Sequence, residues 1–150
     1  MRVARTLLVA ALGAGAVAGV GPSPSGADLG PRIAGNDRYE TAAAVSRASF
    51  SPGVPVVYVV TGAAFPDALA AGPSAAHGRG PILLVQRDAV PQATRDELTR
   101  LQPDEIVVVG GPGAVADSVL AQMDQHTDGD VTRVSGGDRY ATSAAVSAFA

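Results

Sequence analysis

Two stretches of the sequence place an acid, a guanidinium and a phenol next to one another. Asp37, Arg38 and Tyr39 stand in GNDRYETAAAVS, and Arg139 and Tyr140 stand in the later stretch GGDRYATSAAVS. Arginine offers a planar fork of N–H donors to a carboxylate or phosphate, and tyrosine offers a flat face to a sugar. The structural alternative is that arginine pairs with a neighbouring carboxylate and tyrosine packs at a seam between units. The residue types leave both interpretations open.

Both stretches run into an Ala-rich segment that predicts a helix, and the positive N-terminus of a helix favours acids over arginine. Asp37 and Asp138 are placed to cap these helices, and Glu40 could complete a capping box. The second stretch has Ala141 in place of Glu40, so this half of the box is not repeated. Capping therefore explains the aspartates and leaves the arginines and tyrosines unexplained.

The two stretches belong to an internal repeat. Arg32–Ser46 and Arg133–Ser147 align without a gap at a spacing of 101 residues, and ten of the fifteen positions are identical. A period of this length is too long for a solenoid unit and indicates a small α/β domain. We therefore expect one complete unit over residues 31–131 and the truncated start of a second over residues 132–150. The helix of that second copy would have only the first unit to pack against.

The segments between the two copies alternate between strand-like and helical patterns. Short, β-branched, continuously apolar runs predict parallel strands covered on both faces at 55–60, 81–85 and 105–109, with a further strand at 131–134. Helical spacing predicts helices at 66–77, 91–101 and 114–126, the first with a break or kink at Gly72 and Pro73. Repeated βα units of this kind predict a three-layer α/β sandwich with a mainly parallel sheet.

The loop after the first of these strands is a candidate ligand site, because open α/β sheets bind ligands at the carboxyl ends of their strands. Thr61 and Gly62 follow the strand directly, and Asp67 stands at the start of the next helix. The alternative is a plain strand-to-helix turn in which Pro66 starts the helix and Asp67 complements its dipole.

A dinucleotide fingerprint, G-x-G-x-x-A, is satisfied by Gly111–Ala116 between a predicted strand and a predicted helix. The acid that should follow is Asp130, but it precedes the next strand, where it is misplaced for holding a ribose. Pro112 also removes a backbone donor from the turn. A tight turn is therefore the favoured interpretation, and nucleotide binding is the alternative.

Catalysis and metal binding find little support in the sequence. Ser74 resembles a nucleophile elbow only loosely, because it does not follow a strand. His77 and His126 lie near predicted helix C-termini, which favour histidine for dipole reasons alone. There is no cysteine and no closely spaced histidine pair, so a zinc site is not expected. The carboxylates are expected mostly on helix surfaces that face solvent.

The first 30 residues have the pattern of a signal peptide followed by a flexible leader. Arg2 and Arg5 precede the apolar run Thr6–Val20, and Ala16–Ala18 supplies an A-x-A cleavage site. A transmembrane anchor is the alternative, but the run is shorter and less apolar than such anchors require. Cleavage would remove two arginines and leave nine arginines against 14 acidic residues. A broadly basic surface that binds nucleic acid is therefore not expected.

Five ordered motifs resemble the cell wall-binding repeat type 2 family. They are R-[IV]-x-G-x-D-R-Y-x-T at Arg32–Thr41 and again at Arg133–Thr142, T-G-x-x-F-P-D-A-L-A at Thr61–Ala70, P-I-L-L-V at Pro81–Val85 and I-V-V-V-G-G-x-x-A-V at Ile106–Val115. The resemblance implies α/β modules on exported bacterial proteins that bind the wall non-covalently through anionic, teichoic-acid-like polymers. It also implies tandem copies, commonly three around a pseudo-threefold axis, often beside an amidase, protease or adhesin domain. Only one copy is complete here.

We therefore expect a non-catalytic wall-binding module, secreted and held at the cell wall or cell surface, without catalytic residues, metal or cofactor. Its expected partner is an anionic wall polymer, not a nucleic acid or, after signal cleavage, a membrane; repeats or subunits could also associate. The alternatives are an exported, amidase-associated hydrolase, a nucleotide-binding α/β enzyme fragment and a purely structural fragment. The candidate ligand-binding residues are Arg32, Asp37, Arg38, Tyr39, Thr61, Asp67, Arg133, Asp138, Arg139 and Tyr140.

Overall fold

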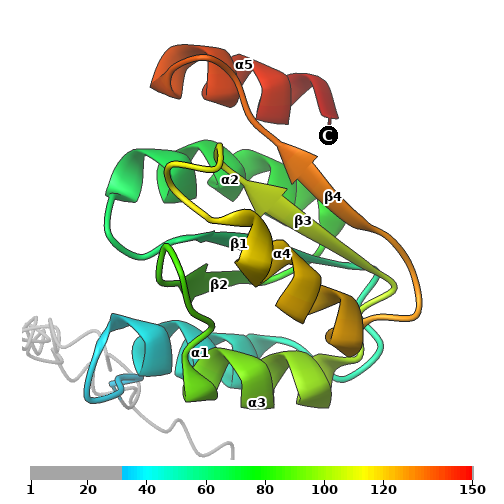
Figure 1. Cartoon of the computed structure of the whole chain (residues 1–150). Helices are drawn as coiled ribbons and strands as arrows, with labels where there is room; N and C mark the ends of the chain where they lie inside the picture. Colours follow the sequence, from blue (N-terminus) through cyan, green and yellow to red (C-terminus); the bar gives the residue numbers. More distant parts are fainter. Residues whose placement is uncertain (1–31, 150) are drawn as a thin grey trace, which may run out of the picture. The chain divides into compact units, whose positions relative to one another are not determined.

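The computed structural model describes residues 32–149, along which helices and strands alternate (Figure 1). The expected signal peptide and leader, residues 1–30, lie outside the described residues. None of the helices within residues 32–149 has the length and apolar character needed to cross a membrane. The elements are α1 (Arg38–Ser49), β1 (Val56–Thr61), α2 (Phe65–Gly78), β2 (Ile82–Val85), α3 (Gln92–Leu101), β3 (Glu105–Val109), α4 (Asp117–Met123), the 3-10 helix η1 (Asp124–His126), β4 (Val131–Val134) and α5 (Arg139–Phe149).

The strands of this region form one parallel sheet in the order β2-β1-β3-β4, which confirms the predicted fold class. β1 and β3 lie in the centre, and every residue of β1 is buried, as its continuous apolar run predicts. β2 is instead an edge strand in which half-buried and buried residues alternate. Val60 pairs with Val109, so Thr61, the last residue of β1, and Gly110, the first residue after β3, lie at the same edge of the sheet.

Helices cover both faces of the sheet and complete the three-layer sandwich (Figure 1). On the face of α1, α3 and α4, Val57 of β1 shares a core with Leu98 and Met123. On the face of α2 and α5, Val60 of β1 shares a second core with Val146. Successive residues of a strand point to opposite faces, so one apolar strand supplies both cores. Each such side chain contributes about 1.5–3 kcal/mol when fully buried.

The next two strands along the chain after β1, which are β2 and β3, lie on opposite sides of β1 in the sheet. α2 leads from β1 to β2, and α3 then leads back past β1 to β3. The loops after β1 and β3 therefore diverge at the carboxyl edge, which is the switch point where open α/β sheets bind ligands. Thr61 and Gly62 lie at one of these loops, and Gly110 and Gly111 begin the other.

Two helix predictions are wrong in detail. The sequence predicts a break or a kink at Gly72 and Pro73, and the break does not occur, because α2 continues through Pro73 to Gly78. Pro73 and Leu69, whose carbonyl loses its helical partner, both lie on the exposed side of α2, where water can reach that carbonyl. The helix predicted over 114–126 is shorter, because α4 begins only at Asp117 and gives way to η1 after Met123.

Candidate functional site

The start of α1 is held by a small set of hydrogen bonds between side chains and the backbone. The Asp37 carboxylate accepts from the Glu40 N–H at 2.8 Å, so the predicted N-cap is confirmed. The Glu40 carboxylate reaches back to the N–H of Asn36 at 2.8 Å, one residue before the position that a capping box uses. The Thr41 hydroxyl accepts from the Gly35 N–H at 3.0 Å and donates to the Asp37 carbonyl at 2.7 Å.

The second copy builds the start of α5 in the same way. The Asp138 carboxylate accepts from the Ala141 N–H at 2.8 Å, and the Thr142 hydroxyl accepts from the Gly136 N–H at 3.0 Å. A Cβ added to Gly136 would lie 2.4 Å from the Cβ of Ala141, so no larger residue fits there. The glycine, aspartate and threonine that the two copies share thus serve the starts of the helices.

Arg38 and Tyr39 both hold Gly62, the first residue after β1. The Arg38 guanidinium donates from Nη1 to the Gly62 carbonyl. The Tyr39 ring packs closely against this residue, as a Cβ added to Gly62 would lie only 2.7 Å from Cε1 of the ring. The Gly62 N–H donates in turn to the Val85 carbonyl of β2 at 2.8 Å. The two side chains that capping left unexplained therefore fix the loop at the carboxyl end of β1.

A cavity of about 280 Å³ opens beside this loop. Thr61 is almost fully buried at its wall, and its hydroxyl accepts from the Ala63 N–H at 3.2 Å. α2 begins here with Ala64 at the N-cap position, which gives no side-chain acceptor to the first-turn N–H groups. An open helix N-terminus favours anions. The cavity is lined by Arg38, Thr61, Gly62, Ala63, Ala64, Ala68 and Leu84.

Asp67, in the first turn of α2, lies against the end of β3. Gly110 follows β3 with a φ of 116°, a conformation that favours glycine. A Cβ added to Gly110 would lie 3.1 Å from the Asp67 carboxylate oxygen Oδ2. The first turn of α2 thus reaches from the loop after β1 to the loop after β3, and both loops belong to one edge of the sheet.

Arg133 fastens the loop between β3 and α4. Its Nη1 donates to the Gly110 carbonyl at 2.6 Å, and its Nη2 donates to the Val115 carbonyl at 2.8 Å and to Asp117 at 2.9 Å. The side chain is only 16% exposed. Arg32, its equivalent in the first copy, is exposed and makes no such bond within the described residues. Arg133 therefore serves the structure of the first unit in this chain.

The second Arg-Tyr pair lies apart from this site. Arg139 and Tyr140 are at the start of α5, and Tyr140 is 79% exposed. No counterpart of Gly62 for the second copy lies within residues 32–149. The arginine and tyrosine at the start of α1 therefore hold the loop after β1, whereas the same two residue types at the start of α5 face solvent.

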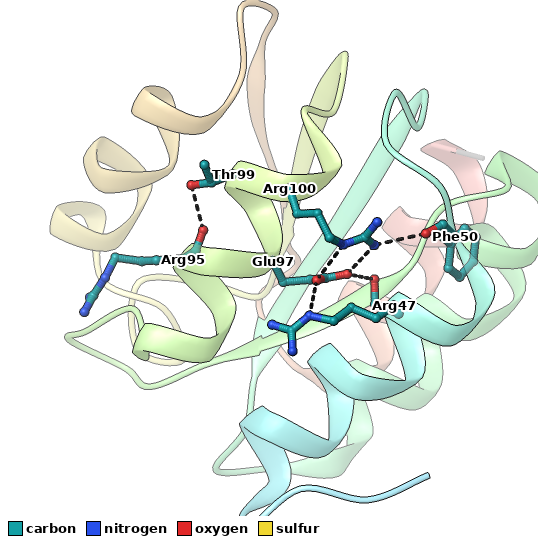
Figure 2. Close-up of polar contacts among 7 residues, drawn as sticks. Arg47, Phe50, Arg95, Glu97, Thr99 and Arg100 are labelled. Carbon is teal, nitrogen blue, oxygen red and sulfur yellow. Dashed lines mark hydrogen bonds and ion pairs between the residues drawn. The ribbon is translucent and has the colours of Figure 1, made fainter. Parts of the chain in front are cut away.

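A buried carboxylate joins α1 to α3, on the face of the sheet that α2 and α5 do not cover (Figure 2). Glu97 is fully buried, and it accepts from the Ser46 hydroxyl at 2.6 Å, from Arg47 at 3.0 Å and from Arg100 at 2.7 and 3.0 Å. Arg100 also donates to the Phe50 carbonyl at the end of α1. Burial alone raises the pKa of Glu97, but the hydrogen bonds from Arg100 and Ser46 and the two positive charges outweigh it and lower that pKa.

The expectation that carboxylates face solvent is therefore wrong for Glu97. The signal was present in the sequence, because Glu97 stands in the buried stripe of α3 with Thr94, Leu98 and Leu101. These spacings of three and four residues place all of them on one side of the helix. An acid inside such a stripe requires a buried partner.

The alternatives from catalysis and nucleotide binding gain nothing from the structure. Ser74 lies inside α2, where it is buried and donates to the Val146 carbonyl at 3.2 Å. Gly111–Ala116 forms turns, and the helix after it has seven residues, so the fingerprint does not open a long helix. Within residues 32–149, no three His, Asp or Glu side chains cluster closely enough to hold a metal ion.

The structure thus divides the sequence-predicted residues into groups. Arg38, Tyr39 and Thr61 meet around Gly62, and Asp67 lies at the adjoining loop. Arg133 holds the same adjoining loop through the Gly110 carbonyl. The remaining residues have other places: Asp37 and Asp138 cap helices, and Arg32, Arg139 and Tyr140 are exposed.

Comparison with known proteins identifies relatives of this chain. The family model for cell wall binding domain 2 (CWB2) matches residues 32–120. The chain is similar to the N-acetylmuramoyl-L-alanine amidase LytC of Bacillus subtilis, with 30% identity over 77% of this chain and 23% of the amidase. It is also similar to the amidase enhancer of the same organism, with 32% identity over 75% of this chain and 16% of that protein.

Two solved structures from Clostridium difficile share the fold. Cwp6 aligns with a TM-score of 0.74 and 33% identity, over 78% of this chain and 18% of the other. Cwp8 aligns with a TM-score of 0.71 and 29% identity, over 77% of this chain and 20% of the other. The chain therefore spans less than a quarter of the length of each of these relatives.

Proposed function

Because this chain belongs to the CWB2 family, a family of cell wall binding domains, we propose that it binds an anionic wall polymer at the carboxyl edge of its sheet. The family makes the chain a wall-binding module and places it at the cell wall or cell surface. The relatives include an amidase and an amidase enhancer, of which it matches only a small part. The binding role therefore belongs to the matched module.

The cavity beside Gly62 is the observation that supports this position for the site. Arg38 lines it and uses one N–H group for the Gly62 carbonyl, which leaves further donors of the guanidinium for a ligand. The N-terminus of α2 adds uncapped N–H groups a few residues away. Both features favour a phosphate or carboxylate group of the polymer.

Asp67 sets a second requirement on the ligand. Its carboxylate repels an anion but accepts hydrogen bonds from sugar hydroxyls. We therefore assign the anionic group to the side of Arg38 and a sugar hydroxyl to the side of Asp67, at the end of β3. A polymer that alternates charged groups with sugars or polyols fits this order.

The remaining site residues and the organisation of the chain complete the proposal. Tyr39 acts by fixing the loop after β1, and Arg133 acts by fixing the loop after β3. Residues 1–30 act as a signal peptide and leader that export the chain, residues 31–131 form the complete repeat, and residues 132–150 begin a second one. A net negative chain binds a polyanion when a few arginines are focused at one edge.

Co-sedimentation of the purified full chain with bacterial walls tests this function. We expect binding to walls that carry anionic polymer and a loss of at least tenfold after hydrofluoric acid has stripped that polymer. Arg38→Gln should reduce binding to intact walls by a similar factor. Equal binding to stripped and intact walls would refute the polymer as ligand.

A matched control separates the site from general charge. Arg79→Gln removes the same charge at the other end of α2, where the C-cap residue has a φ of 54°. Gln102 adopts a φ of 47° as the C-cap of α3, so glutamine is tolerated in this conformation. Arg79→Gln should bind walls as the wild type does. Equal losses in Arg79→Gln and Arg38→Gln would place the site elsewhere.

A further inference from the structure

A second cavity lies at the edge of the sheet opposite the site beside Gly62. Its volume is about 490 Å³, against about 280 Å³ for the cavity beside Gly62. Its walls come mainly from residues 102–104, between α3 and β3, and from residues 125–129, between the end of η1 and β4. Both segments precede strands, so this cavity lies at the amino edge of the sheet. We call it the amino-edge cavity.

The two segments that form the amino-edge cavity are fixed to each other. The Thr127 hydroxyl donates to the Pro103 carbonyl at 2.7 Å and accepts from the Gly129 N–H at 3.1 Å. A Cβ added to Gly129 would lie only 1.9 Å from the Asp104 carbonyl oxygen, so the two backbones are in close contact. The cavity is therefore formed before a ligand enters, which reduces the conformational entropy that binding would lose.

His126 lines the amino-edge cavity, and its neighbour determines which ring nitrogen carries the proton. The Thr99 hydroxyl donates to the Arg95 carbonyl at 2.9 Å (Figure 2). The Thr99 oxygen therefore accepts from the Nδ1–H of His126, at 3.2 Å. Burial and the positive charge of Arg95 lower the pKa of His126, so the ring is neutral near neutral pH. A neutral ring with its proton on Nδ1 has an unprotonated Nε2 that accepts hydrogen bonds.

The other polar side chains of the amino-edge cavity are also rich in acceptors. Asp104 and Asp128 line it from the two segments, and neither forms an ion pair within residues 32–149. Gln102 and Gln125 each add an amide oxygen and an amide NH₂ group. None of the described residues that line the cavity is an arginine. The cavity therefore repels anions and favours a ligand that carries a positive charge and several hydrogen-bond donors.

We propose that the amino-edge cavity binds a sugar that carries a protonated amino group. The ammonium group donates to the carboxylates of Asp104 and Asp128, and such charge-assisted hydrogen bonds are stronger than neutral ones. The sugar hydroxyls bond to Gln102, Gln125 and Nε2 of His126. The volume lies within the range of about 300–1,000 Å³ that small-molecule sites occupy. Binding here does not depend on the anionic polymer at the carboxyl edge.

NMR titration of the ¹⁵N-labelled full chain with glucosamine tests this site. We expect saturable shifts at the amides of Thr127 and Gly129. N-acetylglucosamine, which keeps the sugar ring but has no charge, should bind at least roughly tenfold more weakly at equal ionic strength. The absence of saturable shifts with millimolar glucosamine, or equal affinities for the two sugars, would overturn the proposal.

A pair of double variants separates the cavity from general charge. Asp104→Asn/Asp128→Asn should weaken the binding of glucosamine at least roughly tenfold. Asp124→Asn/Asp130→Asn removes the same charge from positions that flank the cavity without lining it, and it should bind glucosamine as the wild type does. All four aspartates are exposed, so both variants should keep the amide spectrum of the fold outside the cavity. Equal losses of binding in the two variants would overturn the proposal.

The His126 ring provides a second measurement, from long-range ¹H–¹⁵N spectra of the wild type. In the free chain near neutral pH, we expect the proton on Nδ1 and an unprotonated Nε2. The Nε2 resonance should move when glucosamine binds. A proton on Nε2 in the free chain, or an Nε2 resonance that does not move with glucosamine, would overturn the proposal.

Discussion

Replacing Glu97 by glutamine should destabilise the fold, because this carboxylate ties α1 to α3. Glutamine keeps the volume but removes the charge that Arg100 and Arg47 face, and it brings N–H groups toward their donors. Hydrogen bonds to a charged group contribute about 1.5–3 kcal/mol each, and removing one partner of a buried pair costs about 3–5 kcal/mol.

The exposure of the two arginines sets the size of the effect. Arg47 is 51% exposed and Arg100 is 30% exposed, so both can regain water when the carboxylate is lost. Ser46 is buried and retains an acceptor in the amide oxygen of glutamine. We therefore expect a loss of roughly 2–3 kcal/mol, below the cost for a fully buried pair. Tm should fall by roughly 10 °C.

Urea unfolding followed by circular dichroism measures this change. Asp96→Asn is the matched control, since Asp96 precedes Glu97 on α3, is exposed and bonds only to Gln92 among the described residues. It should change the free energy of unfolding by less than about 0.5 kcal/mol. Arg100→Gln should cost more than Arg47→Gln, because Arg100 is less exposed. Neutral surface changes usually alter the free energy of unfolding by less than about 0.5 kcal/mol. A change of that size or smaller in Glu97→Gln would refute the reasoning.

Three further outcomes follow from the structure. Because the pKa of Glu97 is lowered in the folded chain, its charged form stabilises the fold above the pKa of an unfolded glutamate, about 4.3. This stabilisation is lost as the pH falls through the pKa of Glu97 in the folded chain. In urea titrations, acid should therefore lower the free energy of unfolding more in the wild type than in Glu97→Gln. Gly62→Ala should lower the free energy of unfolding by about 1–3 kcal/mol, because the added methyl group would meet the Tyr39 ring. In a double-mutant cycle, Tyr39→Ala should recover part of that loss. Strictly additive losses would argue against the contact. Arg133→Gln should cost about 2 kcal/mol in thermal unfolding at low concentration, whereas the equivalent Arg32→Gln should change stability by less than about 0.5 kcal/mol; equal losses would contradict the assignment of Arg133.

The sequence predicts the parts of the fold that depend on local pattern. Continuous apolar runs locate the strands, and Asp37 and Asp138 locate two helix starts, because side-chain patterning and capping act within a few residues. Of the break or kink predicted at Pro73, the break does not occur, since the exposed side of α2 tolerates the lost hydrogen bond.

The partners of the site residues could not be predicted in the same way. Arg38 bonds to a carbonyl 24 residues away, and Arg133 bonds to one 23 residues away, and both contacts depend on which loops meet at the carboxyl edge. The two copies also differ, because Tyr39 packs on Gly62 while Tyr140 faces solvent. A repeat in the sequence thus shows that a residue type matters without showing which neighbour it contacts.

NMR titration of the ¹⁵N-labelled full chain with a soluble fragment of anionic wall polymer tests the central claim most directly. We predict saturable shifts that are largest at the amides of Gly62, Ala63 and Ala64 and that disappear in Arg38→Gln, while Gly129 at the opposite edge stays unchanged. Saturable shifts confined to the opposite edge, or the absence of any shift at polymer concentrations that saturate co-sedimentation, would contradict the account.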